Sequence, residues 1–145
     1  MNVWDWQAGP GKPVATLKAP QNIIRNPVFS PDGRRLVAVV ATPARVWTWD
    51  MTTAADEGKP QPLPNAWKVS QAVFRPDGRL AVVSGGRVEF LSADGPDEPA
   101  LVGCHAGEIG CAAFSPDGRR LATGAGYKGK GEVRIWDVAR WEKAP

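Results

Sequence analysis

The 145-residue chain has the composition of an ordinary globular protein, with 43% hydrophobic residues, 23% charged residues and a formal net charge of +3. This length fits one domain, and the composition excludes a disordered chain. The basic residues are dispersed among acidic ones, so we expect no nucleic-acid partner.

The few cysteines and the single histidine do not favour a metal site. Cys104 and Cys111 are seven positions apart, and His105 is the only histidine, whereas zinc takes four ligands, or three and a water. The stretch from Met1 to Asp5 lacks the basic start of a signal peptide, and no run of about 18 apolar residues occurs. We expect a cytoplasmic protein with no metal, no cofactor and no membrane partner.

In chain order, the first strands are expected at residues 2–6 and 14–18, and a pattern of eight or nine residues then appears three times. Val28–Leu36, with Ser30-Pro31-Asp32-Gly33 at its centre, recurs at 73–80 and at 113–121. The turn aspartates Asp32, Asp77 and Asp117 are 45 and 40 residues apart. Proline presets φ at the second turn position and glycine tolerates a positive φ at the fourth, so each copy predicts a tight hairpin.

A second marker has nearly the same period. Trp-Asp pairs at Trp4-Asp5, Trp49-Asp50 and Trp136-Asp137 end alternating stretches, and Leu91-Ser92 takes the equivalent place in the middle unit. Alternation of apolar and polar residues, as in residues 133–137, predicts strands, and no stretch has a helical period. The chain therefore divides into units of about 40 to 45 residues, each of three or four short antiparallel strands.

These motifs resemble those of the WD-repeat β-propeller family over nearly the whole chain. The resemblance implies an all-β fold of four-stranded antiparallel blades, about three of them, in an open arc or partial propeller. The expected organisation is a single segment over residues 1–145, with a partial blade at 1–18, units at 19–64 and 65–102, and an incomplete last blade at 103–137.

The chain departs from the family pattern at the residues of its buried hydrogen-bond network. The Gly-His that precedes the first strand of a family blade is approached only by Cys104-His105, and Pro43, Gly85 and Lys130 replace the turn aspartate. We therefore expect that the network does not form as in the family and that packing holds the blades. His105 is expected to be structural, and Trp4, Trp49 and Trp136 are expected to be core anchors between blades.

One glycine-rich stretch imitates a nucleotide-binding motif. Residues 124–129 match G-x-G-x-x-G, and Lys130 extends the match toward a phosphate-binding loop. Both motifs need a helix directly afterward, whereas residues 132–137 read as a strand. We expect an enlarged hairpin connection and no nucleotide.

The absence of a recognisable catalytic set predicts that the chain is not an enzyme. Three blades are fewer than close a ring, so self-association or further blades would complete it. We expect a non-catalytic protein–protein interaction scaffold within a larger or assembled propeller; the alternative is a regulatory or targeting segment of a larger signalling enzyme.

In propellers, binding usually uses the rim formed by the loops before the first strand and between the second and third strands of each blade. Here that rim holds Arg25, Arg45, Trp67, Lys68, Arg87, His105, Tyr127 and Lys128. Trp67, Tyr127 and Arg45 are the expected anchors, because aromatic and arginine side chains dominate interface energies.

Overall fold

A computed structural model describes residues 1–5, 7, 11, 13–18, 24–40, 43–53, 57–63, 68–91 and 101–138, with the backbone alone at 62 and 101–104. Within these ranges the chain forms thirteen strands and no α-helix. The strands are β1 (Asn2–Val3), β2 (Ala15–Thr16), β3 (Ile24–Phe29), β4 (Arg35–Val40), β5 (Arg45–Asp50), β6 (Lys59–Pro62), β7 (Val69–Phe74), β8 (Leu80–Ser84), β9 (Arg87–Leu91), β10 (Leu101–Cys104), β11 (Glu108–Phe114), β12 (Arg120–Tyr127) and β13 (Lys130–Asp137).

The strands form four antiparallel sheets in chain order. The β1–β2 hairpin is followed by two four-stranded sheets, β3-β4-β5-β6 and β7-β8-β9-β10, and by the three-stranded sheet β11-β12-β13. Every strand pairs with its neighbour in the sequence, so each sheet is a simple meander. The prediction of all-β, blade-like sheets is confirmed.

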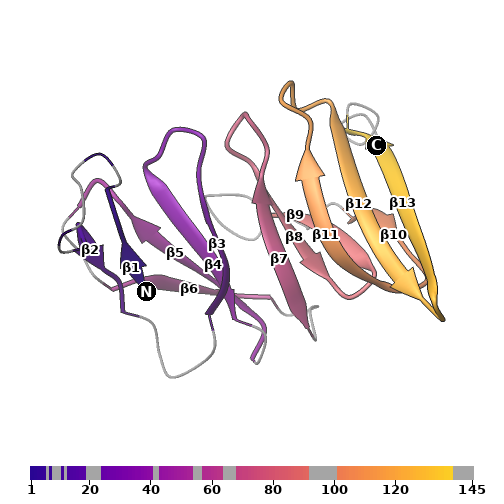
Figure 1. Cartoon of the computed structure of the whole chain (residues 1–145), viewed down its shortest axis with the longest axis horizontal. Coiled ribbons are helices and arrows are strands. Elements are labelled where there is room, and N and C mark those ends of the chain that lie inside the picture. Colours follow the sequence, from indigo (N-terminus) through magenta and orange to yellow (C-terminus); the bar gives the residue numbers. More distant parts are fainter. Residues whose placement is uncertain are drawn as a thin grey trace.

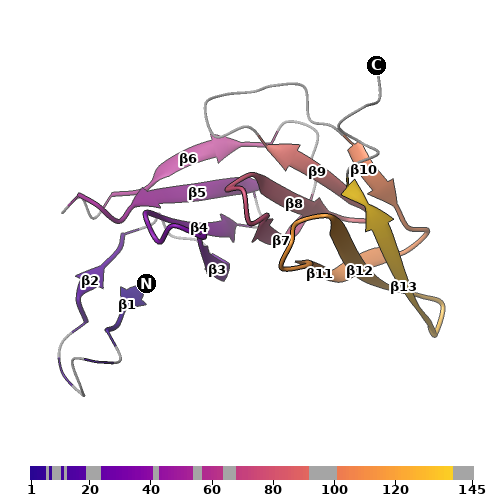
Figure 2. The ribbon, with the colours of Figure 1, turned by 90° about the horizontal axis from the view of Figure 1, so that it is seen from above.

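The sheets lie side by side in an open arc. In Figure 1 the β1–β2 hairpin lies at one end and the β11–β13 sheet at the other. The view from above (Figure 2) shows β3, β7 and β11 along one side of the arc and β6 and β10 along the other. The sheets do not close into a ring, as the strand count predicted.

The Pro-Asp-Gly hairpins have the conformation that their sequences predict. Gly33, Gly78 and Gly118 have φ values of +69°, +88° and +69°. Each turn closes with a hydrogen bond from the glycine N–H to the carbonyl of the residue three positions earlier, at 2.8–2.9 Å. The turns lie at one edge of the arc (Figure 1), and the β4–β5, β8–β9 and β12–β13 turns lie at the opposite edge.

Apolar residues are buried between consecutive sheets, in three clusters. Between the second and third sheets, Val37, Val39 and Val46 pack against Leu80 and Val82. The next cluster joins the third sheet to the fourth and includes Val83, Val88, Ile109 and Leu121. The first cluster joins the hairpin to the second sheet through Leu36, Trp47 and Trp49, against which Val3 and Ala15 pack. Contact between neighbouring sheets alone is the pattern expected of repeat proteins.

The three repeated tryptophans do not share one environment. Trp49 is 1% exposed and Trp136 packs against the cluster between the last two sheets, so both are core anchors as predicted. Trp4 is 56% exposed, so the prediction of a core anchor at this position is wrong. The reason is geometric, since the hairpin is the first sheet of the arc and no other described sheet lies on its outer side (Figure 1).

The glycine-rich stretch is a pair of strands, with no enlarged loop between them. Gly124 and Gly126 lie within β12, and Tyr127 pairs directly with Lys130. The connection is therefore only Lys128 and Gly129, whose φ values are +49° and +77°. Positive φ at both central residues is the signature of a tight type I′ hairpin. Residues 132–137 lie in β13, so the prediction of a strand there is confirmed.

Candidate protein-binding surface

The residues predicted to bind a partner lie at the same ends of their strands. Arg25 and Lys68 lie at the beginnings of β3 and β7, and Arg45 and Arg87 open β5 and β9. Tyr127 and Lys128 stand at the β12–β13 turn. Because consecutive meanders repeat the same direction, these positions share the rim opposite the Pro-Asp-Gly turns (Figure 1).

Exposure differs among these side chains. Arg25, Arg87 and Lys128 are exposed, and Arg45 and Lys68 are partly buried. Tyr127 is 52% exposed, and the Lys128 ammonium lies 5.3 Å from the centre of its ring. Trp67 lies outside the described residues, so its expected role as an anchor stays a prediction.

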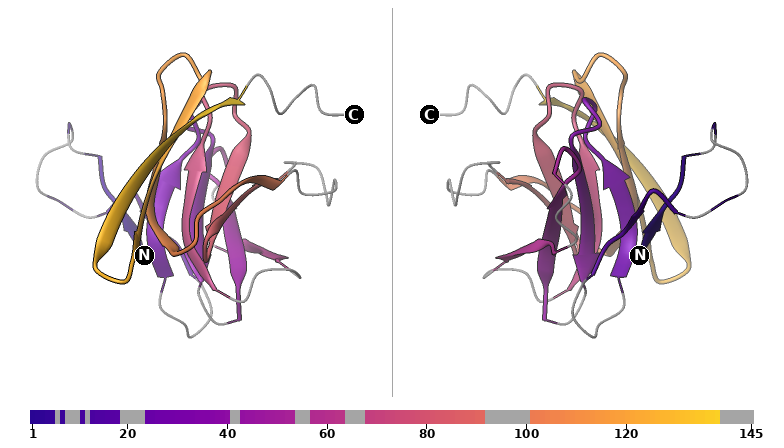
Figure 3. Two further views of the ribbon diagram at one scale, coloured as in Figure 1. Left: turned by 90° about the vertical axis from the view of Figure 1, so that its right-hand side faces the viewer. Right: turned by 90° about the vertical axis from the view of Figure 1, so that its left-hand side faces the viewer.

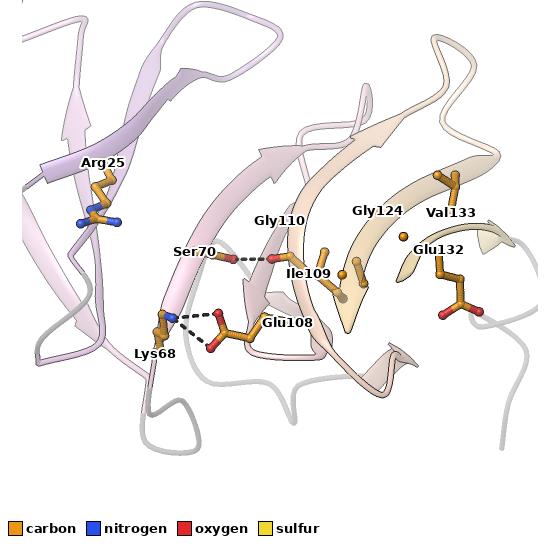
Figure 4. A pocket seen from close by; sticks show the side chains of 12 residues that line it. Arg25, Lys68, Ser70, Glu108, Ile109, Gly110, Gly124, Glu132 and Val133 are labelled. Carbon is orange, nitrogen blue, oxygen red and sulfur yellow. Dashed lines mark hydrogen bonds and ion pairs between the residues drawn. The ribbon is translucent and has the colours of Figure 1, made fainter. Parts of the chain in front are cut away.

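The structure gathers two of the predicted residues, Arg25 and Lys68, into one groove. The groove has a volume of about 600 Å³ and is open to solvent. It is lined by residues of three sheets: Arg25, Lys68, Ser70, Glu108, Ile109, Gly110, Gly124, Ala125, Gly126, Gly131, Glu132 and Val133. Figure 4 shows Lys68 and Glu108 near its middle and Glu132 and Val133 toward the last sheet. We call this hollow the central groove.

An ion pair crosses the central groove. The two Glu108 carboxylate oxygens lie 2.8 and 2.9 Å from Lys68 Nζ, which donates to both (Figure 4). The two side chains are 45% and 55% exposed. The pair joins the residue just before β7 to the first residue of β11 and leaves both charges in contact with water.

Side-chain hydrogen bonds also link the inner strands β3, β7 and β11 beneath the groove. Asn26 Nδ2 donates to the Ser70 carbonyl at 2.6 Å, and Ser70 Oγ donates to the Ile109 carbonyl at 3.2 Å. The Gln71 amide makes two hydrogen bonds with the backbone of Ala112, one in each direction. Because these contacts satisfy backbone groups of the neighbouring sheet, they fix the spacing of β3, β7 and β11.

His105 belongs to a buried network and cannot contact a partner at the surface. Its side chain has no exposed area, Nε2 lies 2.7 Å from Thr123 Oγ1 and Nδ1 lies 3.0 Å from Glu132 Oε2. Trp136 Nε1 donates to the same Thr123 hydroxyl at 2.8 Å. The structure therefore corrects the placement of His105 among the binding residues and supports its structural role.

The same contacts correct the expectation that no such network forms. Lys130 replaces the usual aspartate, but Glu132, two residues further on, supplies the carboxylate. The Arg134 guanidinium donates to Glu132 at 2.6 Å and lowers the pKa of this carboxyl; the bond to His105 acts in the same direction, and partial desolvation opposes both. The last sheet is thus held by hydrogen bonds as well as packing.

Sequence reasoning missed one surface altogether, the outer face of the last sheet. Its central residues Val133 and Ile135 are 75% and 69% exposed. Directly paired residues share a face of a sheet, so the register places Ala113, Ala122 and Ile135 on this face, and also Cys111, Gly124 and Val133. We call these six residues the open face. The alternation in residues 133–137 predicts a strand with an apolar face, but the sequence does not say whether another sheet covers that face.

The described residues contain no group of three or more His, Cys, Asp or Glu side chains that could hold a metal ion. In the same part of the chain, no helix has the length and apolar character needed to cross a membrane.

Comparison with protein-family models gives a match to the last repeat. Residues 99–137 match the family model described as WD domain, G-beta repeat. The matched segment includes the whole last sheet, with its turn and its Trp-Asp pair. No match was found among curated proteins.

Proposed function

We propose that this chain, a WD-repeat protein by its last repeat and by its blade-like sheets, is a non-catalytic scaffold that binds other proteins as part of a larger or assembled propeller. The WD repeat suggests a protein-interaction propeller module. The central groove supports this proposal more than any other feature, because charged side chains from successive sheets converge on it.

The charges of the groove favour a partner that carries both signs. Arg25 and Lys68 bring positive charge from the second and third sheets, and Glu108 and Glu132 bring negative charge from the last one. Opposite charges at fixed positions select a partner by complementarity and fix its register. A surface built from several repeats also spreads the contact over a length that suits an extended protein segment.

The Lys68–Glu108 pair is suited to exchange its partners. An exposed ion pair of this kind contributes only about 0–1 kcal/mol to folding, so a ligand that replaces one member with its own charge disturbs the fold little. Tyr127 and Arg45 on the same rim would add the aromatic and guanidinium contacts that dominate interface energies.

Charge reversal at Lys68 tests this function. The purified chain and its Lys68→Glu variant are immobilised, and proteins retained from extract are quantified by mass spectrometry. The matched control is Lys59→Glu, which makes the same charge change on β6, at an exposed position outside the groove. We expect proteins that the wild type and the control retain, and that Lys68→Glu loses by about tenfold or more. Tyr127→Ala and Arg45→Ala should weaken the same interaction without a matching loss of thermal stability.

Two results would contradict the proposal. One is equal retention by Lys68→Glu and Lys59→Glu, which would place binding away from the groove. The other is a parallel loss of binding and of folding in every rim variant, which would make these residues structural.

A further inference from the structure

The open face is equivalent to sheet faces that are buried against the next sheet elsewhere in the chain, but here it is exposed. The residues at the position of Val133 in the two preceding sheets are Val46 and Val88, which are 0% and 1% exposed, whereas Val133 is 75% exposed. Val46 pairs with Val39, Val88 with Val83 and Val133 with Gly124, so the three positions share one place in the register. In the first two cases the next sheet covers the valine. The last sheet therefore presents the surface of a sheet-to-sheet contact without its cover.

The complementary surface is exposed at the other end of the arc. Trp4 occupies the repeated place of Trp49, but it is 56% exposed where Trp49 is 1% exposed. Val14, 62% exposed, donates its N–H to the Val3 carbonyl across the hairpin. Since alternate residues face opposite sides, Trp4 and Val14 lie on the side away from Val3 and Ala15, which pack on the second sheet. We call the surface formed by Asn2, Trp4, Val14 and Thr16 the tryptophan face.

The two exposed surfaces correspond to the two sides of the buried contacts. In each buried contact, one sheet contributes small or β-branched residues such as Val39 and Val83, and the next contributes larger residues such as Leu80 and Leu121. The open face consists of small or β-branched residues, and the tryptophan face presents one large apolar side chain, Trp4, beside Val14. They stand at opposite ends of the open arc, as the two end views of Figure 3 show, so one chain cannot bring them together.

We propose that the open face of one copy binds the tryptophan face of a second copy, head to tail. This inference deepens the proposed function, on which it rests for the propeller architecture, by naming the partner that extends the arc. Contact between unlike surfaces of identical chains is heterologous and repeats until the assembly closes into a ring or continues as a filament. Gly126 and Gly131, which pair with each other beside the open face on the same side of the sheet, leave room for a large side chain, because an added Cβ at either would meet nothing within 4 Å.

Complementation between two variants tests the proposal. Light scattering coupled to size-exclusion chromatography should give the wild-type chain a mass that is a multiple of 15.5 kDa and rises with concentration. Ile135→Lys damages only the open face and Trp4→Lys only the tryptophan face, so each variant alone should be monomeric. An equimolar mixture should form a dimer of twice 15.5 kDa, because one intact copy of each face remains. Tyr127→Lys, a matched apolar-to-lysine change at an exposed rim position, should assemble as the wild type does.

Cys111 provides a second readout, since its exposed thiol lies on the open face. Its alkylation by iodoacetamide, followed by mass spectrometry of the peptide, should be at least severalfold slower in the assembled wild type than in Ile135→Lys. Circular dichroism checks that each variant is folded. A wild type that stays monomeric at all concentrations, or variants whose mixture stays monomeric, would overturn the proposal. The proposed function is tested separately, by the binding of other proteins to Lys68→Glu, so it would stand even if this assembly did not occur.

Discussion

His105 Nε2 lies 2.7 Å from Thr123 Oγ1, and this contact is the centre of a chain of four side chains. Trp136 donates to the threonine hydroxyl, and Glu132 lies at the other nitrogen of the imidazole. A neutral histidine with its proton on Nδ1 satisfies every group at once, because the threonine O–H then donates to Nε2 and the Nδ1–H donates to Glu132. Thr123 and His105 are the two inner members of this chain, and Thr123 is the one that contacts both Trp136 and His105.

Replacement of Thr123 with valine should destabilise the fold by about 1–3 kcal/mol, because it removes the hydrogen bonds that the Thr123 hydroxyl makes with the Trp136 indole and with the buried His105 imidazole. Valine keeps the shape of the side chain, so lost packing contributes little. Urea denaturation followed by circular dichroism measures the change. Thr16→Val is the control, since that hydroxyl is exposed and, within the described part of the chain, bonds to the exposed Asn2 side chain; its effect should stay within about 0.5 kcal/mol. Equal effects of the two substitutions would show that the network contributes nothing.

The network also shows how far sequence reasoning reaches in this fold. The Pro-Asp-Gly turns and the alternation in residues 133–137 were predictable, because each depends on neighbours in the sequence. The role of Glu132 was not predictable, because the family places its aspartate six residues before the tryptophan, and that position is Lys130 here. Lys130 follows the two-residue turn directly and pairs with Tyr127, so the carboxylate comes from a position inside the strand. Spacing identifies a motif, but the pairing register decides which side chain reaches the histidine.

The position of the exposed rim was also predictable from neighbours in the sequence, whereas the burial of His105 was not. Arg25 and Lys68 lie at strand beginnings that the repeat marks, so their common rim follows from the meander topology. The contact of Lys68 with Glu108 on the last sheet needs the curvature of the arc, which depends on packing between sheets. Trp4 shows the converse case, since the same Trp-Asp pair leaves its tryptophan exposed at one place and buried, as Trp49, at the other.

Gly58→Ala should destabilise the second sheet by about 1–3 kcal/mol through overpacking. An added Cβ would lie 2.6 Å from Trp49 Cε2 and 3.0 Å from Trp47 Cε3. Trp49 cannot move away easily, because it is buried and its indole N–H donates to the Lys18 carbonyl at 3.2 Å. Thermal unfolding followed by tryptophan fluorescence measures the loss. Gly131→Ala, whose Cβ would meet nothing within 4 Å, should change stability by less than about 0.5 kcal/mol; a larger loss there than at Gly58 would refute the packing argument.

Acid should weaken the turns through Asp117. The Ser115 hydroxyl and then the Arg119 backbone N–H donate to this carboxylate and lower its pKa from 3.8. A group whose pKa is lower in the folded state than in the unfolded chain stabilises the fold above the unfolded value and loses that contribution as the pH falls through the folded one. Asp117→Asn should therefore be less stable than the wild type at pH 7 and nearly equal to it at pH 2.

Urea unfolding at the two pH values measures this difference. Ser115→Ala removes the main cause of the lowered pKa, so the double variant should lose less than the sum of the two single losses at pH 7. A loss in Asp117→Asn that is the same at pH 7 and pH 2 would show that the carboxylate charge has no part in the turn.

Lys128→Asn should stabilise the last hairpin. Lys128 and Gly129 have φ values of +49° and +77°, and Tyr127 pairs with Lys130 on either side of them. A two-residue loop of this geometry prefers Asn-Gly, because asparagine tolerates a positive φ better than lysine does. The gain should be roughly 0.5 kcal/mol, since relief of backbone strain is partly offset by loss of the contact between the lysine ammonium and the Tyr127 ring. For a chain of this size that corresponds to a rise in melting temperature of about 1–2 °C. Gly129→Ala should act in the opposite direction and lower the melting temperature by more, because it places a Cβ at a positive φ. If Gly129→Ala left the melting temperature unchanged, the turn could not have the left-handed conformation that brings Tyr127 and Lys130 together.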